Sequence, residues 1–140
     1  MKILVVEDDM VARAGIKRIL SSADIPLDIL LAENGKEGVD YFLDSQNLDV
    51  DFVLLDLNMP VMNGFEFLEA IRKNNLLKDM PVVVHSTSGN PQDLKRCREL
   101  GISGYFVKHI DYTIFKGNLT TIINYWNESK QKKPYAMMPH

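Results

Sequence analysis

The stretch FVLLDLNMPVMNGFEFL, residues 52–68, carries the pattern that decides the fold. Its first four residues are apolar and lead directly into Asp56, which is typical of a short buried strand. A loop over residues 59–64 follows, and apolar residues then recur at the spacing of one helix face. We therefore predict a strand over residues 52–55 and a helix over residues 65–72.

The same alternation of apolar runs and helical patterns extends along the chain in both directions. The predicted strands are residues 3–6, 29–32, 52–55, 81–85 and 105–107. The predicted helices are residues 11–20, 36–43, 65–72, 91–100 and 112–126. Strands that read as continuous apolar runs are typical of a parallel sheet covered by helices on both faces. The sequence therefore predicts a doubly wound α/β fold with five parallel strands.

Composition narrows the class of protein further. The 140 residues suit a single domain, and the net charge of −3 gives no basic footprint for nucleic acid. Cys97 is the only cysteine, which rules out a disulfide within the chain and favours a reducing compartment. No signal peptide and no apolar run of roughly 20 residues are visible, so we expect a soluble cytoplasmic protein without membrane contact. Residues 128–140, rich in lysine with two prolines, are expected to form a mobile tail.

Acidic residues follow two of the predicted strands. Glu7 and Asp8 come after the first strand, and Asp56 comes after the third. If these strands are neighbours, three carboxylates crowd one edge, and two such charges 4 Å apart repel by about 4 kcal/mol at an effective dielectric of 20. Such a cluster must take up a proton or bind a cation, and its oxygen ligands suit Mg²⁺.

Two further polar residues end strands at the same edge of the predicted sheet. Ser86 follows the fourth strand and offers a hydroxyl, and Lys108 follows the fifth strand and offers a cation. A carboxylate nucleophile, a metal ion, a hydroxyl and an ammonium group together suit phosphoryl transfer. An aspartate such as Asp56 can itself accept the group as an acyl phosphate.

Four motifs, in this order and spacing, resemble the receiver domains of two-component response regulators, and stand-alone receivers in particular. They are ILVVEDD (3–9), FVLLDLNMPVMNGFEFL (52–68), VVVHSTS (82–88) and GISGYFVK (101–108). The resemblance covers residues 1–127 and implies a flavodoxin-like (βα)5 fold with strand order 2-1-3-4-5. It also implies a phosphorelay protein that is not a turnover enzyme. Such a protein catalyses both the phosphorylation and the dephosphorylation of its own acceptor aspartate.

The resemblance assigns the metal and acceptor roles residue by residue. Asp56 matches the phosphoacceptor, and Asp8 matches the acid that binds the metal directly. Glu7 matches the second acid, which usually acts on the metal through water, and Asn58 matches the position whose backbone carbonyl is a ligand. The implied ion is Mg²⁺, for which Mn²⁺ can substitute.

The remaining roles concern the switch. Ser86 matches the hydroxyl that moves toward the phosphoryl group, and Lys108 matches the lysine that pairs with it. Tyr105 matches the aromatic switch position, although a strand aromatic is equally often a packing residue. The family usually has proline after this lysine, whereas His109 stands here, so we predict a trans peptide.

The resemblance also implies partners. The phosphoryl donor is expected to be a sensor histidine kinase or a histidine phosphotransfer protein, and the output an unidentified downstream protein. A monomer or a weak homodimer is expected, with pairing through the face formed by the fourth helix, fifth strand and fifth helix, within residues 96–116.

Three other functions stay open at this point. An aspartate-based phosphohydrolase needs a second acid two residues after the nucleophile, where Asn58 stands. A flavodoxin-like FMN protein needs a phosphate loop after its first strand, where the acidic residues 7–9 would repel phosphate. A degenerate receiver would act only as a docking module. Asp9, His85, His109 and Cys97 are interpreted as structural or solvent-facing residues, without a chemical role.

Overall fold

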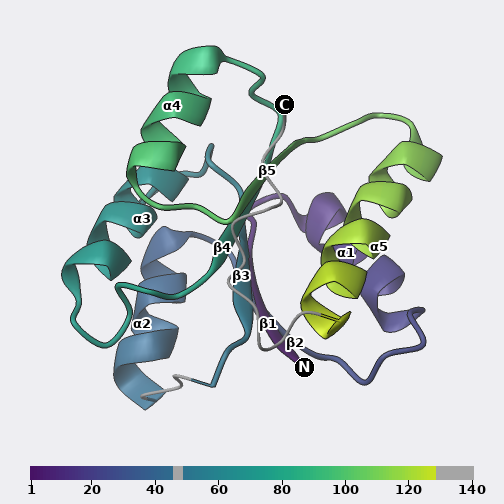
Figure 1. Ribbon diagram of the computed structural model, residues 1–140, viewed down its shortest axis with the longest axis horizontal. Helices are drawn as coiled ribbons and strands as arrows, with labels where there is room; N and C mark the ends of the chain where they lie inside the picture. The colour runs from purple at the N-terminus through teal and green to yellow at the C-terminus, as the bar shows by residue number, and fades with distance from the viewer. Residues whose placement is uncertain (46–48, 129–140) are drawn as a thin grey trace.

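The computed structural model describes residues 1–45 and 49–128, in which strands and helices alternate strictly (Figure 1). The strands are β1 (Lys2–Val6), β2 (Asp28–Ala32), β3 (Phe52–Leu55), β4 (Val82–Ser86) and β5 (Gly104–Val107). The helices are α1 (Met10–Ser21), α2 (Gly35–Ser45), α3 (Gly64–Lys73), α4 (Pro91–Glu99) and α5 (Tyr112–Glu128). All ten predicted elements are confirmed, with their ends within about two residues of the predicted ones, as is usual for helix ends. The predicted tail is wrong at Glu128, which belongs to α5, and its residues 129–140 lie outside the described part.

The five strands form one parallel sheet in the order β2-β1-β3-β4-β5, which confirms the predicted flavodoxin-like topology. In the register between the two central strands, Val6 lies beside Leu55. The Asp56 N–H donates to the Val6 carbonyl at 3.0 Å and continues this pairing one residue further. Because the two strands end at neighbouring positions, the residues that follow β1 and β3 lie side by side at the carboxyl edge of the sheet.

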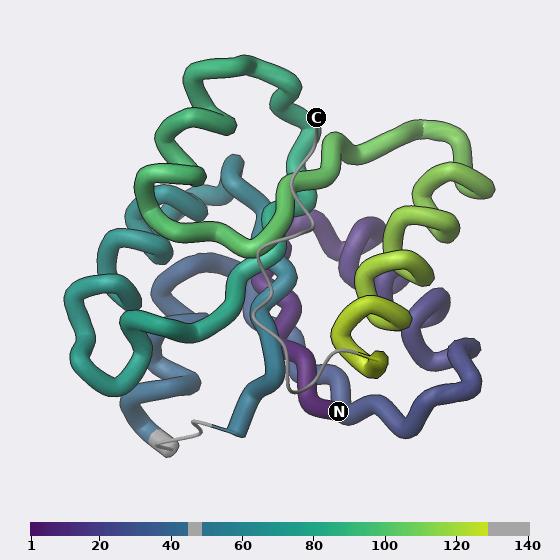
Figure 2. Tube along the Cα trace, in the orientation of Figure 1, coloured from purple at the N-terminus to yellow at the C-terminus, as the bar shows by residue number. Residues whose placement is uncertain are grey.

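Helices cover both faces of the sheet, with α2, α3 and α4 on one side and α1 and α5 on the other (Figures 1 and 2). Alternate strand residues point to opposite faces, so β1 sends Leu4 and Val6 into the first layer and Ile3 and Val5 into the second. Both layers are apolar, which explains why the central strands read as continuous hydrophobic runs.

Side-chain caps begin two of the helices that follow the loops at the carboxyl edge of the sheet. Asp9 caps α1 by accepting from the Val11 and Ala12 N–H groups. Asn63 forms a capping box with Glu66 at the start of α3. Gly64 is required there, because a Cβ atom would lie 2.5 Å from the Asp56 carbonyl oxygen. The start of α3 thus packs directly against the backbone of Asp56.

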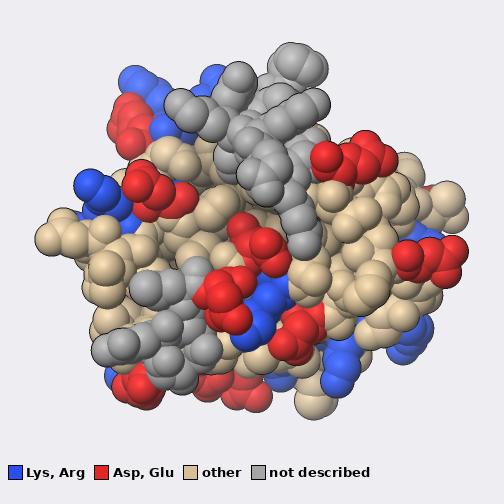
Figure 3. All heavy atoms as spheres, turned by 60° about the horizontal axis from the view of Figure 1, so that its bottom comes forward, with Lys and Arg blue, Asp and Glu red and all other residues tan. Residues whose placement is uncertain are grey.

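The opposite end of the sheet, which Figure 3 brings forward, carries charges of both signs. Acidic side chains gather near the centre of this face around a basic group. Lys2 contributes one ion pair to the molecular surface, with its Nζ 2.8 Å from the Asp49 carboxylate. Within residues 1–45 and 49–128, no helix combines the length and the apolar character that a membrane crossing requires.

Candidate phosphoacceptor and metal site

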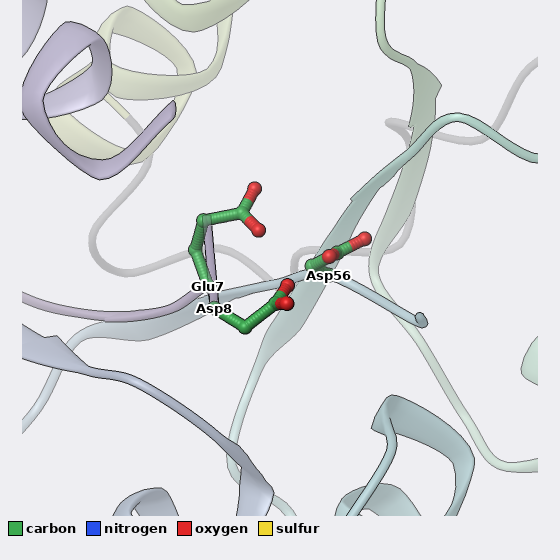
Figure 4. Close-up of side chains that lie close together, drawn as sticks. All are labelled: Glu7, Asp8 and Asp56. Carbon is green, nitrogen blue, oxygen red and sulfur yellow. The ribbon is translucent and has the colours of Figure 1, made fainter. Parts of the chain in front are cut away.

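Three carboxylates converge at the carboxyl edge of the sheet, as the sequence predicts. Glu7 and Asp8 follow β1 and Asp56 follows β3, and one oxygen of each lies within 4.8 Å of the others. Figure 4 shows the three carboxylates facing a common space between the ends of the two strands. Glu7 and Asp56 are buried, at 2% and 6% exposure, whereas Asp8 is exposed. All-oxygen donors of this kind fit a hard cation such as Mg²⁺, with Asp8 on the solvent side.

Burial and the neighbouring charges change the pKa of Asp56. Burial, and then the neighbouring Glu7 carboxylate, raise the pKa of the Asp56 carboxyl to about 7, against the opposing effect of the Lys108 ammonium. Asp56 is therefore close to half-protonated near neutral pH when no cation is bound. A divalent cation at these carboxylates would offset the crowded negative charge and favour loss of that proton.

Lys108 reaches into this cluster from the end of β5. Its ammonium forms a hydrogen bond and ion pair with Glu7, and its Nζ lies 3.8 Å from Asp56 Oδ1. The Lys108 N–H donates to the Ser86 carbonyl at 2.7 Å, which fixes the backbone of the lysine beside β4. The peptide between Lys108 and His109 is trans, which confirms that prediction.

Ser86 lies at the end of β4 and is fully buried. Its Oγ accepts from the Ser88 N–H at 3.3 Å, and the Ser88 hydroxyl in turn donates to Asp93 at 2.5 Å. The hydroxyl that the sequence singles out is therefore part of a hydrogen-bonded loop between β4 and α4. Asn58 is exposed and follows Asp56 by two residues, with its N–H 3.5 Å from Asp56 Oδ1.

Tyr105 lies inside the molecule, with 3% of its surface exposed. Its hydroxyl donates to the Ser88 carbonyl at 2.7 Å, so the ring is tied to the same β4–α4 loop as Ser86. Burial raises the pKa of the phenol. Packing and loop contact are thus combined in one residue, and the switch role remains a prediction.

The residues interpreted as structural have structural surroundings. Asp9 is the cap of α1, which confirms that interpretation. His85 is buried beside the Phe115 ring, at a centroid distance of 5.2 Å, and burial lowers its pKa to about 4, so it is neutral. His109 is exposed, and its Nδ1 accepts from the Asp111 N–H. Cys97 is buried, and burial raises the pKa of its thiol to about 12, which makes it unreactive.

Sequence reasoning missed one residue at the site, Arg13. Its guanidinium donates to the backbone carbonyls of Glu7 and Asp8, each at 2.8 Å. Only the position of the arginine four residues after the α1 cap could have pointed to it, because a side chain there can reach back toward the β1–α1 loop.

Comparison with known proteins gives consistent matches. The response regulator receiver domain model matches residues 3–119. The chain is 33% identical over 123 residues to a chemotaxis protein CheY homologue of Campylobacter jejuni, covering 88% of this chain and 92% of that protein. The chain is also 35% identical to the nitrate/nitrite response regulator NarL of Escherichia coli, over 109 residues that make up 78% of this chain. It spans only 48% of NarL, about half the length of that relative.

Solved structures agree with these matches. The phosphorylated cyanobacterial phytochrome response regulator RcpA superimposes with a TM-score of 0.85 at 30% identity, covering 95% of this chain and 97% of that one. The Mn²⁺-bound form of response regulator Rcp1 gives 0.82 at 27% identity, covering 91% and 95%. Fold, acid cluster and sequence matches lead to one conclusion: the chain belongs to the response regulator receiver domain family of two-component systems.

Proposed function

We propose that Asp56 accepts a phosphoryl group from the phosphohistidine of a sensor histidine kinase or a histidine phosphotransfer protein. Receiver domains are signalling domains of phosphorelays, and family membership supports this coarser function directly. The observation that carries the finer proposal is the convergence of Glu7, Asp8 and Asp56, with the Lys108 ammonium 3.8 Å from Asp56. In the reaction an Asp56 carboxylate oxygen bonds to phosphorus, the phosphorus–nitrogen bond of the donor breaks, and the imidazole leaves with its electron pair and takes up a proton.

The acid cluster is the proposed Mg²⁺ site, in which Mn²⁺ can substitute. Asp8 and Asp56 would be direct ligands, Glu7 would act through water, and the backbone carbonyl of Asn58 would complete the protein ligands. When bound, the ion neutralises charge on the transferring phosphoryl oxygens. The Mn²⁺-bound state of Rcp1 supports a divalent ion in this fold, and the phosphorylated state of RcpA supports the acceptor role.

Lys108 and Ser86 are the proposed partners of the phosphoryl oxygens. Lys108 is held by Glu7, and its ammonium is already within 4 Å of Asp56, so a small side-chain movement would bring it to a new anion. The Ser86 hydroxyl would turn from the Ser88 N–H toward the phosphoryl group. Preorganised donors of this kind stabilise developing charge in transfer in both directions, so phosphorylation and loss of the group are self-catalysed.

Signalling would run through the β4–α4 loop to a partner protein. Ser86 and Tyr105 both contact this loop, through the Ser88 N–H and the Ser88 carbonyl. A shift of Ser86 toward Asp56 would therefore disturb the hydrogen bond that holds Tyr105, and would alter the α4-β5-α5 face. That face is the proposed site for the target and for weak homodimer formation, with the cytoplasm as the expected compartment.

The test is incubation of the purified chain with Mg²⁺ and acetyl phosphate, followed by intact-protein mass spectrometry. We expect the mass gain of one phosphoryl group, lost in Asp56→Asn and in EDTA. Asp24→Asn is the matched control, because it makes the same chemical change at an exposed position outside the acid cluster. An unchanged mass for the folded chain would contradict the proposal and favour a docking module. A gain that survives Asp56→Asn would place the acceptor elsewhere.

A further inference from the structure

Arg13 forms a clamp on the loop that carries the two amino-terminal acids. Its Nη1 lies 2.8 Å from the Glu7 carbonyl oxygen and 2.8 Å from the Asp8 carbonyl oxygen. Its Nη2 lies 3.5 Å from Glu33 Oε1 at the end of β2. Only 13% of the side chain is exposed, which is low for an arginine on a surface helix.

The position of this cation is electrostatically unfavourable in isolation. Arg13 lies in the first turn and a half of α1, where its own N–H bonds to the Asp9 carbonyl at 2.9 Å. Its guanidinium folds back toward the amino-terminal end of the helix, where the helix dipole disfavours positive charge. The carbonyl contacts must therefore offset this penalty, and charge-assisted hydrogen bonds are the strong class of such contacts.

The two carbonyls belong to the peptide units on either side of Asp8. The Glu7 N–H is held separately by the Ala32 carbonyl at 3.0 Å. The backbone is thus held before Glu7, between Glu7 and Asp8, and after Asp8, which sets the direction in which both Cα–Cβ bonds leave the loop. Without these bonds, the repulsion among the three carboxylates would act on a less restrained β1–α1 loop.

We infer that Arg13 is a positioning residue of the proposed metal site. It holds Glu7 and Asp8 in the geometry that binds a divalent cation, and it does so through backbone carbonyls without touching the ion. The inference rests on the proposed function, because it concerns the same site.

The sign of the effect separates this role from simple electrostatics. A positive charge near the acids lowers their affinity for a cation, so removing it would tighten Mg²⁺ binding if charge alone mattered. If Arg13 acts by positioning, removing it loosens the loop and weakens Mg²⁺ binding. Substitution of a residue that hydrogen-bonds to a metal-binding segment usually lowers the metal affinity by about 10-fold or more. We therefore expect Mg²⁺ binding to weaken by roughly tenfold when Arg13 is replaced.

The experiment measures the Mg²⁺ dissociation constant of the unphosphorylated chain by following backbone amide shifts during a titration. Arg13→Gln removes the charge and most donors, and Arg13→Lys keeps the charge with a different donor geometry. Arg72→Gln is the matched control, because Arg72 also clamps backbone carbonyls, at 2.7 Å from Leu100 O and 2.9 Å from Met80 O, outside the acid cluster. Urea unfolding of every variant measures how much of any change is loss of stability.

A second readout needs no metal. The Asp9 N–H lies 3.3 Å from Glu7 Oε2, so its hydrogen exchange reports whether the loop keeps its shape. We expect faster exchange at Asp9 in Arg13→Gln than in Arg72→Gln at matched stability, with Arg13→Lys between Arg13→Gln and the unchanged chain in both measurements.

The outcomes are distinguishable. Weaker Mg²⁺ binding in Arg13→Gln, with unchanged affinity in Arg72→Gln, supports the inference. Equal or tighter binding in a folded Arg13→Gln overturns it and leaves the proposed function intact. Absence of Mg²⁺ binding by the unchanged chain would overturn both. If Arg13→Gln does not fold, Arg13→Lys decides, and an affinity equal to that of the unchanged chain overturns the inference.

Discussion

Replacement of Asp56 by asparagine should make the metal-free fold more stable near neutral pH. The structure places this carboxylate in a buried position between two other acids, so its charge opposes folding when no cation is present. Asparagine keeps the size and shape of the side chain and removes the charge. The substitution that abolishes the proposed phosphorylation should therefore raise the free energy of unfolding.

The distances show which effect dominates. At the limiting separation of 4.8 Å and an effective dielectric of 20, Glu7 repels Asp56 by about 3.5 kcal/mol. Lys108 at 3.8 Å attracts it by about 4 kcal/mol under the same assumption. These two effects nearly cancel, and burial of the carboxylate is the largest cause of its raised pKa, so burial supplies most of the destabilisation.

The pKa of Asp56 gives the size of this destabilisation and its pH dependence. The pKa is raised from its usual value of 3.8 to about 7 in the folded chain, a difference that corresponds to about 4 kcal/mol as an upper bound. Between these two pH values the folded state binds more protons than the unfolded state, so stability falls as pH rises through that window. Asp56→Asn should lack this part of the slope.

The assay is urea unfolding in EDTA at about pH 4.5 and about pH 8, a range that spans most of the transition. Trp126 is the only tryptophan, and its ring stacks on Phe52 at 5.1 Å, so its fluorescence reports loss of the core. Asp24→Asn is again the control, because it makes the same substitution at an exposed position outside the acid cluster. If Asp56→Asn is no more stable than the unchanged chain at the higher pH, the argument that a buried, crowded carboxylate opposes folding is wrong.

Two further predictions concern the backbone around the acceptor. Val61 has a positive φ of 68° and is exposed, so Val61→Gly should relieve strain and raise the free energy of unfolding by about 0.5–1 kcal/mol in the same urea assay; a loss of stability would contradict the strain. Gly64→Ala should destabilise the chain by about 3 kcal/mol and impair phosphorylation, because the new Cβ would lie 2.5 Å from Asp56 O and 2.7 Å from Leu57 Cα. The control is Gly15→Ala in α1, where nothing lies within 4 Å of the new Cβ, and it should stabilise the chain by about 1 kcal/mol. Equal effects of the two glycine substitutions would show that steric contact at Gly64 is not the cause.

The sequence was sufficient to predict the fold and the acid cluster for one physical reason. Buried parallel strands are continuous apolar runs, and the first polar residue after such a run marks the edge of the sheet. Glu7 and Asp56 are those first residues, and the register that sets Val6 beside Leu55 brings them together. The local sequence pattern therefore predicted that Glu7 and Asp56 meet, once β1 and β3 were assumed to be neighbours in the sheet.

Other features of the site depend on side-chain paths that no local pattern encodes. The sequence suggested Lys108 as a partner of the phosphoryl group, whereas the structure pairs it with Glu7. Arg13 lies on an amphipathic helix, and only the folded chain shows its guanidinium reaching back to two carbonyls. Val61 is β-branched, which gives no indication of its positive φ.

The two cationic side chains at the site, Lys108 and Arg13, bond to different kinds of acceptor. Lys108 bonds to a carboxylate and is free to change partner, because a phosphoryl group beside it would compete with Glu7 for the same ammonium. Arg13 bonds to two main-chain carbonyls, and a phosphoryl group does not compete for carbonyl acceptors. The Arg13 contacts with the β1–α1 loop would therefore persist if Lys108 moved. If Lys108 left Glu7 for a phosphoryl group, the unpaired Glu7 carboxylate would attract the proposed metal ion, and Arg13 would hold the backbone of Glu7 in place. Metal binding and phosphorylation should therefore reinforce each other, because the phosphoryl group would add negative charge and oxygen ligands beside Asp56, and a divalent cation would offset that charge.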